Sequence, residues 1–260
     1  MGRILINNVP TWALFLSMVF LIVAFAVTVR FITSRYFPHL RLNKNDYITT
    51  YIDILRSGET IFIAFTVIVL WQTYTTTKLF VSQEANELAK VIIDSQVFSA
   101  KEKLVLERGV KNYIQILRQE EWPLMREGKK SANAEKAFAN LFYLLAQNAS
   151  PSDEKERVYY REIISSLNKA AEARRFRLEK VNSNVPTIIV VVIVISSLSL
   201  IALLAMLEED RFVMRSLVYL VSIVIALYLS LILLLDYPFS GEISVSNQPF
   251  TEGILENLGG

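Results

Sequence analysis

Two acidic residues, Glu84 and Asp236, each follow shortly after an apolar stretch of the chain. If these two stretches are neighbours in a membrane, both carboxylates come close together at one membrane face. Carboxylate and carbonyl oxygens are the ligands that hard cations such as Ca²⁺ prefer, and Glu242 could add a third oxygen. Glu84, Asp236 and Glu242 are therefore a candidate calcium site. A structural alternative stays open, in which Asp236 caps a helix or pairs with a nearby arginine.

Small hydroxyl residues mark one face of the second apolar stretch. The face consists of Thr66, Val69, Thr73 and Thr77. Their spacing of i, i+3, i+7 and i+11 places them on one side of a helix. Hydroxyl groups find no partners in lipid, whereas in a water-filled pore they replace part of an ion's hydration shell. The pattern predicts a pore-lining face, and packing between membrane helices is the alternative interpretation.

Apolar runs without charged residues determine the fold class. The runs 12–29, 60–77, 186–207 and 216–235 contain no Asp, Glu, Lys, Arg or His. At about 1.5 Å per residue, each is about long enough to cross roughly 30 Å of hydrocarbon. We predict an all-α polytopic membrane protein with four transmembrane helices. The second is expected to begin at Thr60, after Ser57-Gly58-Glu59, and to continue as one helix to Gln96.

A polar region, residues 82–184, separates the second span from the third and is predicted to be a helical cytosolic domain. Ser99 and Glu102 have the spacing of a capping box, which begins a helix. Pro123 must end or kink a helix because it has no backbone donor. The arginines within residues 174–177 are predicted to bind lipid headgroups. The expected division is residues 1–81 for the N-terminal tail and two spans, 82–184 for this domain, 185–236 for a hairpin of two spans, and 237–260 for a C-terminal tail.

Composition excludes several classes of function. The chain has no cysteine and a single histidine, His39, which excludes thiolate and two-histidine metal sites. The net charge of +2 gives no electrostatic footprint for nucleic acid. No Gly-rich phosphate loop and no Gly-x-Ser-x-Gly motif occur, so the protein is predicted not to be an enzyme. No carboxylate lies within the apolar runs, which argues against a proton-coupled transporter.

Three short segments together resemble a known family. They are Glu84-Ala, after the second span, Glu121-Trp-Pro, in the polar region, and Asp236-Tyr-Pro-Phe-Ser-Gly, at the end of the fourth span. In this order and spacing, over roughly residues 60–255, they resemble the bestrophin-like family of mainly bacterial membrane proteins. The resemblance implies a four-span helical protomer with cytosolic termini. It also implies kinship with bestrophins, which are oligomeric, calcium-regulated anion channels with a pore along the symmetry axis.

The expected function follows from the motifs and this resemblance together. We expect a homo-oligomeric ion channel of the bacterial plasma (inner) membrane, with the second span lining the pore and a divalent cation such as calcium regulating it. Four spans put both termini and residues 82–184 on one side, taken as the cytosol. The partners would be the lipid bilayer, further copies of the chain and inorganic ions, with no nucleic acid. The alternative is a non-conducting membrane scaffold or sensor whose cytosolic domain binds a partner or a divalent cation.

Overall fold

The computed structural model of the protein describes residues 2–40, 42, 46–182, 185–207 and 212–258. The chain forms two compact units. The first, here called the membrane unit, comprises Met1–Gln72 and Ser183–Asp236. The second, here called the helical domain, comprises Thr73–Asn182 and Tyr237–Gly260. The sequence-based division was at residues 81/82 and 184/185, whereas the units divide at 72/73 and 182/183, and the C-terminal segment belongs to the helical domain.

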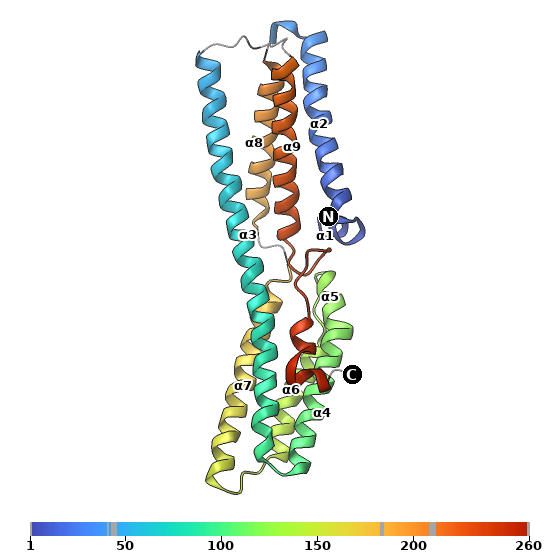
Figure 1. Cartoon of the computed structure of the whole chain (residues 1–260), viewed down its shortest axis with the longest axis vertical. Coiled ribbons are helices and arrows are strands. Elements are labelled where there is room, and N and C mark those ends of the chain that lie inside the picture. The colour runs from blue at the N-terminus through green and yellow to red at the C-terminus, as the bar shows by residue number, and fades with distance from the viewer. Residues whose placement is uncertain (1, 41, 43–45, 183–184, 208–211, 259–260) are drawn as a thin grey trace. The chain divides into compact units, whose positions relative to one another are not determined.

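Among the residues that the structure describes, four helices are long and apolar enough to cross a bilayer, and their apolar parts lie in the membrane unit. Its helices are α1 (Gly2–Asn8), α2 (Thr11–Arg35), η1 (Pro38–Leu40), the first part of α3 (Asp46–Asp94), α8 (Thr187–Met206) and α9 (Phe212–Leu235). Helices α2, α8 and α9 pack against one another (Figure 1). The predicted all-α fold with four membrane-spanning helices is confirmed. Residues 208–211, which connect the two spans of the expected hairpin, lie outside the described residues.

Helix α3 begins at Asp46, well before the expected start at Thr60. Gly58 lies inside this helix, and a Cβ atom built there would meet nothing within 4 Å. A single glycine costs a helix only about 1 kcal/mol relative to alanine, so without a proline the helix continues. The predicted helix start at Ser57-Gly58-Glu59 is therefore wrong. Glu59 becomes a buried residue of the membrane unit, and Ser197 of α8 donates a hydrogen bond to it.

The helical domain is built from the second part of α3 and the segments that follow it. These are η2 (Ser95–Val97), α4 (Ala100–Ile116), the π turn η3 (Leu117–Glu121), α5 (Trp122–Arg126), α6 (Ala132–Asn148), α7 (Glu154–Glu179), η4 (Gln248–Thr251) and η5 (Gly253–Leu258). Their apolar stripes meet in one core, to which α3 contributes Val81 and Leu88, and α4 contributes Val110. Because the apolar residues of each helix repeat at the helical period, they lie on one face, and packing of these faces against one another buries them.

Local signals in the sequence set the ends of these helices. Ser99 accepts a hydrogen bond from the backbone of Glu102, whose side chain accepts one in return, so the predicted capping box is confirmed. Pro123 lies in the first turn of α5, directly after the π turn, as expected of a residue without a backbone donor. Asp153 caps α7 by accepting a hydrogen bond from the backbone of Glu156.

The C-terminal segment after Asp236 forms part of the domain core. Phe239, Val245 and Phe250 are buried in it together with residues of the four longer helices. Gly241 has a φ of 75°, in the left-handed region that glycine adopts without strain. This turn lets the chain reverse between Phe239 and Val245, so the Phe-Ser-Gly element is a packing device.

Candidate functional site

A buried cluster of charged side chains lies at the centre of the helical domain. Glu84 of α3 is fully buried and accepts a hydrogen bond from the hydroxyl group of Tyr113 on α4. Arg177 of α7 donates to the same carboxylate from Nε, at 2.7 Å from Oε2, and from Nη2, at 3.2 Å from Oε1. This two-point contact fixes both the position and the rotation of the Glu84 carboxylate.

A second carboxylate extends the cluster. Glu121, at the end of the π turn, accepts a hydrogen bond from Nη2 of Arg177 at 2.7 Å and another from Nη2 of Arg174 at 2.5 Å. Neither carboxylate has measurable exposure, and Arg177 is also fully buried. Two carboxylates and two guanidinium groups balance in charge, which is the condition under which charges persist in a protein interior.

The secondary structure explains how these side chains reach one another. Arg174 and Arg177 are three residues apart on α7 and therefore share one face. On this buried face of α7 they follow Ile163, Leu167 and Ala170 at helical spacing. The π turn rotates the chain after α4 so that Glu121 points into the same interior.

Aromatic rings close the cluster on another side. The Cζ atom of Arg177 lies 5.4 Å from the centre of the Trp122 ring, within the range of a cation–π contact. The Trp122 ring packs edge-to-face against Phe239 at 5.6 Å and against Phe250 at 6.1 Å between ring centres. Each of the three segments that resemble the bestrophin-like family therefore contributes a residue to this packed assembly: Glu84, Trp122 and Phe239.

Burial and the neighbouring carboxylates shift the protonation equilibria of the cluster. Burial, and next the Glu84 carboxylate, raise the pKa of Tyr113 well above its usual value of 10.0. Burial alone would lower the pKa of Arg177, but the carboxylates of Glu84 and Glu121 outweigh it and raise that pKa. The phenol therefore stays neutral and the guanidinium stays charged over the whole physiological range, so the cluster holds a fixed arrangement of charge.

The predicted arginine cluster at the lipid headgroups is wrong for two of its members. Arg174 and Arg177 are buried and ion-paired, while Arg175 is exposed and lies 3.9 Å from Glu179. Their spacing on the buried stripe of α7 was a signal in the sequence, because an arginine that continues an apolar stripe needs a buried acidic partner. That partner could not be named from the sequence, since Glu84 and Glu121 are far away along the chain.

The three residues proposed as calcium ligands fall in different surroundings. Glu84 is held by Arg177 and Tyr113, and Glu242 is an exposed residue of the same domain. Asp236 belongs to the membrane unit, where Oδ1 accepts a hydrogen bond from the backbone N–H of Val185 at 2.9 Å. Within the described part of the chain, no group of three or more His, Cys, Asp or Glu side chains has the arrangement of a metal site. The calcium site stays a prediction.

The four residues proposed to line a pore do not share one environment in the protomer. Thr66 and Thr77 are buried, and each hydroxyl group donates to the backbone carbonyl one turn earlier. Thr73 is half-buried, and Val69 is exposed. Hydroxyl groups that bond to their own helix need no water, so the threonine pattern is explained in part by local bonding. The pore-lining assignment stays a prediction.

The fold and the buried cluster define the protein as a helical membrane protein with a charge-balanced helical domain. A family model for the Bestrophin-like domain matches residues 20–250. The chain belongs to the bestrophin-like family, as its three motifs predicted. None of the curated proteins compared with the sequence matches it.

Two solved structures of a bacterial protein are similar in fold to this chain. A crystal structure of a bacterial bestrophin homologue from Klebsiella pneumoniae, which carries one substitution, is 11% identical in sequence. The match covers 94% of this chain and 97% of that chain, with a TM-score of 0.74. A second structure of that homologue, solved by Zn-SAD phasing, is 12% identical, and the match covers 94% of this chain and 96% of that one at a TM-score of 0.74. These similarities establish a common fold.

Proposed function

We propose that this protein is a homo-oligomeric ion channel of the bacterial plasma membrane, with α3 lining the pore. Membership of the bestrophin-like family is the observation that carries the proposal. A protomer with four membrane-spanning helices is too small to enclose a pore easily by itself, so conduction requires several copies. The partners are therefore further copies of the chain, the surrounding lipid and the ions that pass.

The exposed face of α3 is the part of the helix that suits a pore between protomers. A side chain that faces such a pore is exposed in the single protomer. Phe62, Phe65 and Val69 meet this condition, and Gln72 continues the same face at helical spacing. Of the residues predicted from the sequence to line the pore, Val69 lies on this exposed face, whereas Thr66 is buried. A ring of such apolar side chains forms a constriction that gates by excluding water, while Gln72 offers a polar ring next to it.

An ion-flux assay on purified protein in liposomes tests the channel. K⁺ and Cl⁻ gradients are applied in turn, with and without Ca²⁺. Val69→Thr should raise the flux several-fold, because a hydroxyl group in an apolar constriction favours wetting. Val27→Thr is the matched control, since Val27 is an exposed valine on α2. Absence of flux under all conditions, or a strictly monomeric mass in detergent, contradicts the proposal.

Regulation by a divalent cation is the finer part of the proposal. A cation at Glu84 must compete with Arg177, which already contacts both oxygens of that carboxylate. Binding would therefore open the buried cluster and change the packing of α7 against α3. Ca²⁺ should then alter flux in the original protein and not in Asp236→Asn or Glu242→Gln. An identical response of all three proteins removes these ligands from the proposal.

The orientation of the protein is part of the same proposal, with the helical domain and both termini in the cytosol. Because the chain has no cysteine, single cysteines introduced at exposed positions report their side directly. Tyr143 on α6 of the helical domain and Tyr47 at the N-terminal end of α3 are both exposed. In intact cells a membrane-impermeant thiol reagent should label Tyr47→Cys and leave Tyr143→Cys unlabelled until the cells are opened. The reverse pattern refutes the orientation.

One feature of the helical domain favours the alternative function, a non-conducting scaffold or sensor. A cavity of about 590 Å³ lies between α6 and α7, with Phe138 and Phe142 in its wall. Its charged lining contains Lys130, Arg174 and Arg175 together with Glu135 and Glu179, so cations are in excess. Such a mixed lining suits a partner segment that carries an acidic group beside an apolar one. A monomeric protein that shows no flux but binds an acidic peptide through Arg175 would establish this alternative.

A further inference from the structure

Glu59 is a buried carboxylate of the membrane unit that the proposed pore does not use. Its side chain is 5% exposed. The hydroxyl group of Ser197 donates a hydrogen bond to Oε1. The other oxygen, Oε2, is buried and has no hydrogen-bond partner among the described residues. A buried carboxylate oxygen without a partner is costly, and such groups in membranes commonly mark functional sites.

The bond to Ser197 fixes the depth of Glu59 in the bilayer. Ser197 lies near the middle of α8, which runs from Thr187 to Met206 over 20 residues. At about 1.5 Å per residue, either end of this helix is roughly 15 Å away, which is half the thickness of the hydrocarbon core. The carboxylate therefore lies level with the middle of α8, roughly 15 Å from the headgroups at either end of that helix.

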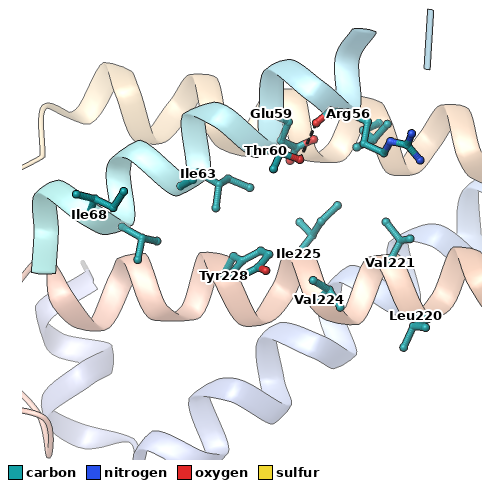
Figure 2. A pocket seen from close by; sticks show the side chains of 13 residues that line it. Arg56, Glu59, Thr60, Ile63, Ile68, Leu220, Val221, Val224, Ile225 and Tyr228 are labelled. Atoms are coloured by element: carbon teal, nitrogen blue, oxygen red, sulfur yellow. Dashed lines mark hydrogen bonds between the residues drawn. The ribbon is translucent and has the colours of Figure 1, made fainter. Parts of the chain in front are cut away.

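Glu59 lines a cavity of about 610 Å³ between α3 and α9. Ile63 of α3 faces Ile225 and Tyr228 of α9 across this cavity (Figure 2). Most of the other lining residues are also apolar, and Leu220 and Tyr228 are partly exposed, so the cavity opens to the side of the membrane unit. A ligand can thus enter from the bilayer. The volume lies within the range of about 300–1,000 Å³ that is usual for small-molecule sites.

We propose that this cavity binds an amphiphilic amine, whose ammonium group pairs with Glu59 and whose hydrocarbon chain lies between α3 and α9. The ammonium N–H donates to Oε2, the oxygen that has no partner, while Ser197 continues to donate to Oε1. The negative charge is then neutralised at the depth where it is most costly. The ring of Tyr228 offers an additional aromatic wall that attracts cations.

Other cations fit this cavity less well. A small inorganic cation needs several oxygen ligands to replace its water, and apolar walls do not supply them. The ammonium group of a phospholipid lies in the headgroup region, roughly 15 Å away from this depth. Arg56 also lines the cavity and repels cations, but its guanidinium lies 2.9 Å from the carboxylate of Asp53, which compensates its charge. The remaining class is a chain with a single ammonium head and no phosphate.

Binding can be measured with dodecylamine on the purified full chain in detergent. A ligand that binds the folded state raises the melting temperature, and the rise grows with the logarithm of the ligand concentration relative to its Kd. Dodecanol has the same chain without the charge and serves as the ligand control. Glu59→Gln keeps the size of the side chain and its contact with Ser197 but removes the charge. Asp53→Asn removes an exposed carboxylate of the same helix and serves as the protein control.

Dodecylamine should stabilise the original protein and Asp53→Asn alike. Its affinity should fall about ten- to hundredfold in Glu59→Gln, which is the usual loss for one hydrogen bond to a charged group. Val224→Phe places a larger side chain in the cavity from α9 and keeps Glu59, and it should weaken binding even if Glu59→Gln does not fold. Equal effects of dodecanol and dodecylamine, equal binding by Glu59→Gln, or undiminished binding in Val224→Phe would overturn the proposal.

Discussion

Replacement of Arg177 by methionine is the sharpest perturbation of the buried charged cluster. The substitution keeps an unbranched side chain of similar length but removes three contacts to carboxylate oxygens, at 2.7, 3.2 and 2.7 Å. Glu84 and Glu121 are then buried with too little positive charge around them. Breaking a buried ion pair on one side typically costs about 3–5 kcal/mol, so Arg177→Met should destabilise the helical domain by that amount.

A second substitution separates the charge effect from the loss of packing. In Arg177→Met combined with Glu84→Gln, the remaining pair of Glu121 and Arg174 is balanced, and the new amide can still accept the hydrogen bond from Tyr113. The double variant should therefore be more stable than Arg177→Met alone by about 2 kcal/mol. This order of stabilities is unusual, because most second substitutions destabilise further.

Trp122 provides the assay, since its ring lies 5.4 Å from the Cζ atom of Arg177. Trp12 and Trp71 are exposed, and both can be changed to phenylalanine to leave a single reporter. Denaturant unfolding in detergent, followed by fluorescence and checked for reversibility, gives the stability of each variant. Arg161→Met is the matched control, because Arg161 is an exposed arginine on the same helix.

The control substitution should change the stability by no more than about 0.5 kcal/mol. If Arg177→Met is tolerated as well as Arg161→Met, the cluster does not stabilise the domain. If the double variant is less stable than Arg177→Met, uncompensated charge is not the cause of the loss. Either result refutes the account of a charge-balanced centre.

Three further predictions concern the same domain. Phe250→Ala should destabilise it by about 3–5 kcal/mol in the Trp122 assay, because a fully buried ring is lost, and a loss below 1 kcal/mol would show that the C-terminal segment is not part of the core. Tyr113 has a raised pKa in the folded state, so its contribution to stability is present below the unfolded pKa of about 10 and is lost as the pH rises above it. Tyr113→Phe should therefore weaken the alkaline loss of stability, and an unchanged unfolding profile above pH 10 would contradict this. Ser99→Ala should lower the free energy of unfolding by about 1 kcal/mol. It should also raise the pKa of Glu102, because the hydrogen bond from the Ser99 side chain is the chief cause of its lowered pKa. Titration of the Glu102 carboxylate by NMR would show no change if the capping box does not form in solution.

The sequence was sufficient for the features that depend on neighbouring residues. Four apolar runs specify membrane-spanning helices, because a bilayer admits no other way to satisfy the backbone of such segments. The capping box at Ser99 and the position of Pro123 in the first turn of α5 follow from local hydrogen bonding. The start of α3 could not be read so easily, since Gly58 resembles a break and costs the helix only about 1 kcal/mol.

The partners of the buried charges were decided by the tertiary structure. Glu84 and Arg177 are 93 positions apart in the chain, and no local pattern shows which acidic residue meets which arginine. The same holds for Glu59, whose burial depends on Ser197, 138 positions away. The sequence by itself determined that this is a helical membrane protein of the bestrophin-like family. Only the packing of distant helices decided which of its carboxylates are neutralised by arginine and which one has an oxygen without a partner.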